Sequence, residues 1–271
     1  MKYMIMGMEP RGEFRQLPSD EQNRRIRKHQ KALDDLLRAR VIGGRPGLIF
    51  VSAGLGSAGL GPFHGDEGDP ITVKNRGGKH LRVDGPFPET REVLGGFDII
   101  DFESRAEAMD FAKAEHDHES QIAEIRPIRE FWWISQTHGS RATKLFMLTS
   151  VEDERAVLSL PDSERKVIMR QHQAVGAEYV TKRGMLDQEP GLWVGARLAI
   201  SSEAKTIRWT GGARHVTDGP FAETREVAGG FNLIACNSID EAIGWAEKLA
   251  PRAGDAIELR SVDGCWWVYH E

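Results

Sequence analysis

A fourteen-residue stretch that occurs twice constrains this chain more than any other feature. Residues 84–97 read DGPFPETREVLGGF, and residues 218–231 read DGPFAETREVAGGF. The two copies agree at twelve of fourteen positions and lie 134 residues apart. Chance does not produce a match of this length, so the chain is predicted to be a tandem repeat of two related units.

Composition narrows the class of protein. The chain has 271 residues, so each unit is long enough to bury a core of its own. The net charge is −5 and the basic residues form no block, which argues against a nucleic-acid partner. No apolar run reaches the roughly 18 residues of a membrane span. No signal-peptide pattern opens the sequence, and a cytoplasmic location is expected.

The two cysteines are expected to be packing residues. Cys236 and Cys265 align with Phe102 and Phe131 of the first unit. A position that holds Phe in one unit and Cys in the other suits apolar packing better than a disulfide or a catalytic thiol.

Apolar periodicity and turn signals predict the same order of elements in both units: strand, helix, strand, hairpin, strand, helix and strand. This order forms an antiparallel sheet with both helices on one face, the ferredoxin-like α+β arrangement. The other sheet face stays apolar, so the two units are expected to pack sheet to sheet as an intrachain pseudo-dimer. The predicted elements of the first unit are 2–8, 19–41, 47–51, 71–74, 80–83, 97–102, 105–115 and 121–128. Those of the second unit are 143–149, a helix that begins near 161, 192–200, 206–209, 231–236, 238–249 and 256–262.

The glycine-rich segment 52–69 matches a nucleotide-binding motif only in part. Residues 54–59 fit the G-x-G-x-x-G spacing after a strand. That motif needs a helix to open at its third glycine, and Gly61-Pro62 prevents one here. Ten residues of this segment are also extra relative to the second unit. We interpret the segment as a hairpin tip and expect no cofactor.

The repeated stretch resembles the signature of the YCII-related, or DGPF-domain, family. Further resemblances are the opening KYM strand, a histidine in the middle of the first helix, and Glu124-Ile125-Arg126-Pro127 in the closing strand. The resemblance covers units at 1–134 and 142–271, joined by a linker at 135–141. It implies the fold of the dimeric α/β-barrel superfamily, with a cleft in each unit and a histidine and an aspartate as an active pair.

The resemblance does not select a reaction. The superfamily includes isomerases, cofactor-free monooxygenases and dehalogenation-related proteins, and shared fold is a weak guide to chemistry. The second unit also departs from the first, since Ser261 replaces Pro127 and Ala235 replaces Asp101. If Asp101 takes part in chemistry, the second site is impaired.

Two of the nine histidines are candidates for acid–base catalysis. Only His29 and His172 occupy corresponding positions, each eleven residues after the proline that precedes its helix. Both lie on the apolar stripe of the helix, so both are expected to face the sheet. Imidazole exchanges protons near neutrality, as such catalysis requires. The alternative is a core histidine bonded to a backbone group.

Charged residues of the repeated stretch are the candidate partners. Asp84 and Asp218 are the predicted orienting acids for the histidines, although an aspartate before Gly-Pro also serves to close a turn. The alternating charge that follows each aspartate fits either a ligand-binding pocket mouth or an ion-paired strand edge. The four ligand-binding candidates are Glu89, Arg91, Glu223 and Arg225.

A metal site is not predicted. Residues 115–119 read EHDHE, but the corresponding residues 249–253 contain no metal ligand, and charge is common after a helix end. Trp132-Trp133 and Trp266-Trp267 are expected to pack between the units or between the subunits of a further homodimer.

These observations predict a protein that binds an unknown small molecule in a cleft of each unit and uses histidine for proton transfer. The alternative is a non-enzymatic structural or regulatory module whose sheets present a partner surface. An open cleft at the histidines favours the first hypothesis, and a space filled by side chains favours the second.

Overall fold

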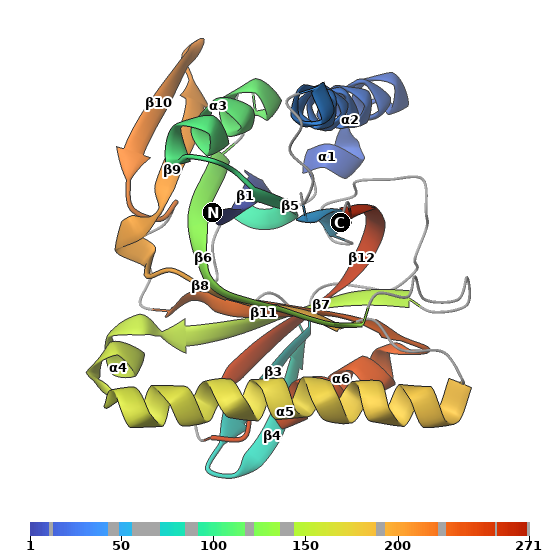
Figure 1. Cartoon of the computed structure of the whole chain (residues 1–271), viewed down its shortest axis with the longest axis vertical. Coiled ribbons are helices and arrows are strands. Elements are labelled where there is room, and N and C mark those ends of the chain that lie inside the picture. The colour runs from blue at the N-terminus through green and yellow to red at the C-terminus, as the bar shows by residue number, and fades with distance from the viewer. Residues whose placement is uncertain are drawn as a thin grey trace.

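The chain has an α+β fold in which helices cover the outer faces of antiparallel strands (Figure 1). The structure, a computed structural model, describes residues 1–10, 13–42, 49–55, 71–84, 92–116, 122–135, 144–187, 193–221, 226–252 and 254–269. The first repeat contains β1 (Lys2–Pro10), α1 (Glu13–Gln16), α2 (Ser19–Ile42), β2 (Ile49–Leu55), β3 (Ile71–Arg76), β4 (Lys79–Asp84), β5 (Glu92–Asp101), α3 (Arg105–Glu115) and β6 (Ile122–Ser135). The second contains β7 (Lys144–Asp153), α4 (Glu154–Ser159), α5 (Asp162–Asp187), β8 (Trp193–Leu198), a 3-10 turn (Ser201–Glu203), β9 (Lys205–Thr210), β10 (Ala213–Asp218), β11 (Glu226–Cys236), α6 (Ile239–Leu249) and β12 (Ala256–Tyr269).

Eight strands from both repeats form a closed antiparallel ring. The order is β1, β5, β2, β12, β7, β11, β8 and β6, and β6 pairs again with β1. The repeats meet at two edges of the ring, where β6 pairs with β8 and β12 pairs with β2. Figure 1 shows α2 and α3 outside the strands of the first repeat, and α5 and α6 outside those of the second.

Each hairpin is attached to the other repeat, which the element order did not reveal. The β3–β4 hairpin pairs with β12, and the β9–β10 hairpin pairs with β6. The four other strands of each repeat keep the predicted ferredoxin-like order, β6–β1–β5–β2 and β12–β7–β11–β8, so only the attachment of the hairpin differs from the expectation. The reason is the length of the closing strand. The first half of β6 pairs with β1 and its second half with β8, so the free edge of the first half receives a hairpin from the partner repeat.

The β3–β4 hairpin also supports the end of α6 in the second repeat. Asn75 Nδ2 donates to the carbonyl of Ala250 at 3.0 Å, and His80 Nε2 lies 2.9 Å from the same oxygen. The backbone of Asn75 bonds Gly254 and Asp255 in the segment that follows. Hairpin and helix end are thus held together across the repeats.

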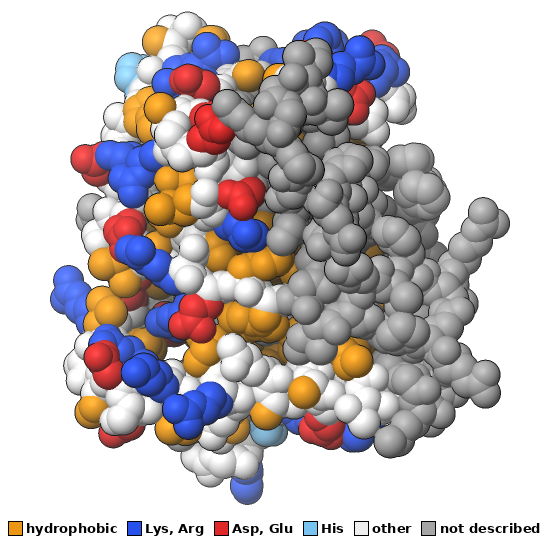
Figure 2. Space-filling model, viewed as in Figure 1, with side chains coloured by type: hydrophobic (Ala, Val, Ile, Leu, Met, Phe, Trp, Pro, Cys, Tyr) orange, Lys and Arg blue, Asp and Glu red, His pale blue; other side chains and the backbone are white. Residues whose placement is uncertain are grey.

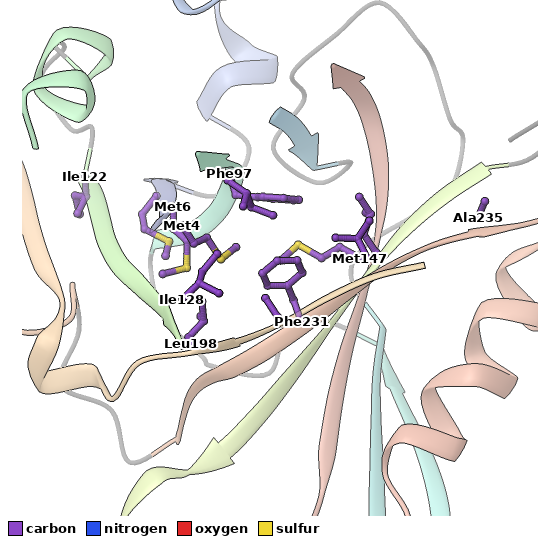
Figure 3. Packing of buried hydrophobic residues seen from close by; sticks show 14 residues of the cluster. Met4, Met6, Phe97, Ile122, Ile128, Met147, Leu198, Phe231 and Ala235 are labelled. Carbon is purple, nitrogen blue, oxygen red and sulfur yellow. The ribbon is translucent and has the colours of Figure 1, made fainter. Parts of the chain in front are cut away.

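Buried side chains fill the space inside the ring (Figure 3). Met4 and Met6 enter from β1, and Met147 enters from β7. Phe97 and Phe231, the last residue of each repeated stretch, pack with ring centroids 5.8 Å apart. The two copies of the stretch therefore meet in the interior.

A buried Glu-x-Arg pair in each closing strand ties the repeats together. Arg126 of β6 donates to the carbonyl of Ala228 at 2.6 Å, and Arg260 of β12 donates to the carbonyl of Leu94 at 2.8 Å. Each arginine also bonds the glutamate two residues before it. Leu94 and Ala228 are corresponding residues of the repeated stretch. Each repeat therefore donates a hydrogen bond to the same position of the other repeat.

The glutamate of the first pair anchors the DGPF segment of the second repeat. Glu124 Oε2 accepts the backbone N–H of Phe221 at 3.0 Å, and Thr206 Oγ1 donates to the carbonyl of Gly219 at 2.8 Å. Gly219 has φ +95°, a conformation that side chains with a Cβ avoid. Phe221 packs against the interior cluster. The glycine and phenylalanine of the motif thus shape and fix a turn.

The packing prediction for the cysteines is confirmed where the structure describes them. Cys236 is fully buried against the helices of the second repeat. Its counterpart Phe102 is equally buried in the first repeat. The side chain of Cys265 lies outside the described part.

Charge is mixed on the described surface. Figure 2 shows basic and acidic side chains interspersed over one face. Among the described helices, none combines the length and the hydropathy needed to cross a bilayer.

Candidate functional site

Both predicted histidines face the sheet from the long helix of their repeat. His29 of α2 meets Asp98 of β5 and Glu115 of α3. His172 of α5 lines a cavity between the helices and the sheet of the second repeat. The inward orientation inferred from helical spacing is therefore observed in both repeats, but the surroundings differ.

His29 lies between two carboxylates. Its Nδ1 is hydrogen-bonded to Glu115, and its Nε2 lies 3.6 Å from Asp98 Oδ1. Burial alone would lower the pKa of His29, but Glu115 and Asp98 outweigh it and raise the pKa to about 9. The side chains of Asp98 and Glu115 are only 4% and 8% exposed. The two carboxylates thus stabilise the protonated form of His29.

His172 has lost both acidic partners. The residues that correspond to Asp98 and Glu115 are Asn232 and Leu249. Burial lowers the pKa of His172 to about 4, and Asp255 opposes this only in part. The same histidine position is therefore charged in one repeat and neutral in the other.

Polar and apolar side chains both line the cavity beside His172. Its volume is about 50 Å³, enough for a few water molecules or a small ligand. Arg252 makes three hydrogen bonds to Asp255, whereas Arg197 Nη2 lies 3.5 Å from Glu152 Oε1. Burial raises the pKa of Glu152, although Arg197 lowers it.

Two buried polar atoms in the cavity wall lack partners. Trp132 Nε1, a donor, and Asn232 Oδ1, an acceptor, have no hydrogen bond within the described residues. Buried polar groups are normally satisfied, so an unpaired donor and acceptor in one cavity point to a bound molecule or water. Trp132 belongs to β6, so the first repeat completes the cavity of the second. This contact agrees with the inter-repeat packing expected of the tryptophans.

Two glycines make room for the cavity wall. A Cβ built on Gly195 would stand 2.1 Å from Trp132 Nε1, and one on Gly229 would stand 2.2 Å from the carboxyl carbon of Glu152. Gly229 is the first of the paired glycines in the repeated stretch. Gly229 is therefore required for steric reasons, because a side chain at this position would overlap the carboxyl group of Glu152.

Gly195→Ala is expected to displace the Trp132 indole from the cavity. The new methyl group occupies the place of the ring, and such overpacking costs about 1–3 kcal/mol of unfolding free energy. Chemical denaturation measures the cost, and the Trp132 indole N–H signal in NMR reports the displacement. Gly244→Ala on α6 is the matched control, since nothing lies within 4 Å of its added Cβ. This change should be neutral or stabilising by up to about 1 kcal/mol. Equal stability of the two variants would contradict the packing argument.

Of the two predicted orienting acids, Asp218 is the one whose side chain the structure describes, and it does not reach His172. Asp218 ends β10, is 82% exposed, and pairs with Lys205. Asp255, not Asp218, is the carboxylate that acts on His172. The predicted pair of His172 with Asp218 is thus not formed, because the hairpin of Asp218 is attached to the other repeat. The backbone of Asp84 ends β4 opposite Ile71, and its side chain lies outside the described part.

The four pocket-mouth candidates cannot be placed. Glu89, Arg91, Glu223 and Arg225 lie outside the described residues, as does the glycine-rich segment from residue 56 to its end. Asp101 bonds the Met1 amino group at 2.7 Å and Lys2 at 3.2 Å. This pairing gives Asp101 a role at the end of β1.

Sequence reasoning missed the residues that distinguish the two repeats. Asp98 and Asn232 follow the final phenylalanine of the repeated stretch, and that exchange of acid for amide was the available signal. Glu115 belongs to the string considered as a metal site, where its loss in the second repeat argued against a role. Glu9 and Glu152 were also overlooked. They face Val93 and Val227 at corresponding strand positions, so each repeat places a half-buried carboxyl there.

Comparison with known proteins agrees with the repeated signature. The sequence matches the YCII-related domain twice, over residues 1–132 and 145–263. It is 37% identical over 106 residues to an uncharacterized protein of Rhizobium meliloti (strain 1021), which covers 39% of this chain and 80% of that protein. A mutant chlorite dismutase from Candidatus Nitrospira defluvii aligns at 7% identity and a TM-score of 0.42, covering 97% of this chain and 90% of that one. Because the two matched segments span nearly the whole sequence, the chain belongs to the YCII-related domain family.

Proposed function

We propose that the cavity of the second repeat binds a small organic anion, such as a carboxylate, and that His172 accepts a proton from it. The observation that carries the proposal is a neutral imidazole in a cavity whose wall holds an unpaired donor, Trp132 Nε1, and an unpaired acceptor, Asn232 Oδ1. Arg197 and the indole N–H supply the contacts that an oxyanion requires.

The first repeat supports the choice of an anion. The corresponding histidine there has two carboxylates beside it and a pKa of about 9, whereas the pKa of His172 is about 4. A carboxylate bound beside His172 would replace part of what the second repeat has lost. It would raise the pKa of His172 toward neutrality, where imidazole is an effective proton acceptor.

The test uses the full chain and a panel of short carboxylates that includes acetate, malonate and benzoate. We expect at least one to raise the melting temperature and to raise the NMR-measured pKa of His172 from about 4 by one or more units. His172→Asn and Arg197→Leu should weaken binding at least about tenfold, equivalent to about 1.4 kcal/mol.

The matched control is His215→Asn, because His215 is an exposed residue of β10. It should bind the carboxylate as the parent does. Unchanged binding in His172→Asn, or no upward shift in the pKa of His172 with any bound carboxylate, would overturn the proposal.

We further infer that the tandem repeat packs as an intrachain pseudo-dimer. The two inter-repeat strand edges, the exchanged hairpins and the paired Arg126 and Arg260 contacts support this arrangement. In the first repeat both ring nitrogens of His29 face carboxylates, those of Glu115 and Asp98. These surroundings favour the alternative hypothesis, a non-enzymatic structural or regulatory module.

A further inference from the structure

Three potential metal ligands converge in the first repeat, apart from the cavity described above. His29 comes from α2, Asp98 from β5 and Glu115 from the end of α3. One ligand atom from each lies within 4.8 Å of the other two. Ligand atoms that share a transition-metal ion at about 2.1 Å stand roughly 3–4 Å apart, so only small side-chain adjustments separate this arrangement from a coordination sphere.

The carboxylates of this group are deeply buried. Asp98 and Glu115 are 4% and 8% exposed, and Glu115 Oε2 is a buried atom with no hydrogen bond within the described residues. That oxygen lies 3.9 Å from His116 Nδ1, which is itself bonded to the carbonyl of Ala112. Two carboxylates held together away from water are costly unless a cation balances them, and a metal ion bound to neutral His29 would supply that charge in place of the imidazolium. An oxygen without a donor is the atom that a metal ion would satisfy.

The second repeat serves as an internal control. It keeps the histidine as His172 but carries Asn232 and Leu249 in place of the two acids. Within the described residues, no second group of three such ligands is found. A histidine that served only to fill the core would not require two buried carboxylates beside it, as His172 demonstrates.

We propose that His29, Asp98 and Glu115 bind one divalent first-row metal ion per chain, of the Zn²⁺ or Co²⁺ type. One imidazole and two carboxylates are ligands that such ions accept. Three protein ligands leave a position open for water or a small ligand. His29 is 22% exposed, so the group has a path to solvent. The elements that hold the ligands are two helices and a strand of the ring, which fix their positions.

Metal titration of the chelator-treated full chain tests the proposal. Isothermal titration with Zn²⁺ should give one ion per chain. Substitution with Co²⁺ should give visible d–d absorption and paramagnetically shifted imidazole signals from one histidine. Asp98→Asn and Glu115→Leu, which install the residues of the second repeat, should each weaken Zn²⁺ binding at least about tenfold, as loss of a ligand does.

Two further variants keep the test decisive. Asp110→Asn removes an exposed carboxylate of α3 and should bind Zn²⁺ like the parent. Glu115→Gln retains the size of the side chain, so it should fold even if Glu115→Leu does not, and it should still lose affinity. The proposal is overturned if the parent binds no stoichiometric ion, or if folded Asp98→Asn and Glu115→Gln bind as tightly as Asp110→Asn. Carboxylate binding at His172 is measured separately, so either proposal can fail alone.

Discussion

Arg126→Leu is expected to lower the free energy of unfolding by about 3–5 kcal/mol. Arg126 is buried inside the ring, where it bonds Glu124 and the carbonyl of Ala228 in the other repeat. Its removal leaves the buried Glu124 carboxyl without its arginine partner, and it leaves the carbonyl of Ala228 without this donor. Both costs fall on the contact that ties the repeats together, and equilibrium denaturation in urea measures their sum.

Two further variants separate the effect of the buried charge from the effect of the inter-repeat hydrogen bond. Arg129→Leu removes a neighbouring arginine that is 55% exposed, and it should change stability by less than about 1 kcal/mol. Glu124→Gln combined with Arg126→Leu removes the buried charge and keeps an acceptor for the N–H of Phe221. The double variant should therefore be more stable than Arg126→Leu alone. If Arg126→Leu and Arg129→Leu lower the free energy of unfolding equally, the contacts of Arg126 with Glu124 and Ala228 do not contribute to stability.

Glu9→Gln is expected to change the pH dependence of stability. Burial, assisted by Glu13 and opposed by Arg25, raises the pKa of Glu9 from 4.5 to about 8. Between these values the folded state holds a proton that the unfolded state has released, so stability falls as the pH rises from about 5 to 9. One pKa unit corresponds to about 1.4 kcal/mol, and with residual solvation we expect a loss of about 2–4 kcal/mol.

The measurement compares unfolding free energies of the variant and the parent at pH 5, 7 and 9. Glutamine has the shape of protonated glutamate, so Glu9→Gln should match the parent near pH 5 and exceed it by about 2–4 kcal/mol at pH 9. Glu130→Gln, at an exposed position of β6, should show no such divergence. A constant difference between Glu9→Gln and the parent across this range would show that Glu9 ionises as it does in water.

Local patterns were sufficient for much of the fold. The helix around His29 and the helix around His172 follow from apolar spacing and turn signals, and so does the inward orientation of both histidines. The closing strand was recognised but ends later than predicted, at Ser135 rather than near residue 128. Its extra length cannot be judged from periodicity, because the bulge after Ile128 reverses which side chains face inward.

The candidate site was less predictable, because a side chain's partners depend on which elements pack together. Asp218 belongs to the same repeat as His172, but its hairpin pairs with β6 of the first repeat. Trp132 likewise belongs to one repeat and completes the cavity of the other. No pattern within a single unit contains this exchange, because the hydrogen bonds that create it join strands far apart in the chain.

The duplicated DGPF stretch by itself determined that this protein consists of two homologous units of one family, since chance does not produce so long a match, and the order of the predicted elements determined their α+β class. Tertiary structure alone decided what the duplication does. It joined both sheets into one ring and made Glu124 the anchor of Phe221 in the DGPF segment of the other repeat. It also placed acids beside His29 but an amide and a leucine at the positions around His172. The physical reason is that a pKa and a cavity depend on neighbours in space, and two nearly identical motifs with different neighbours become two different sites.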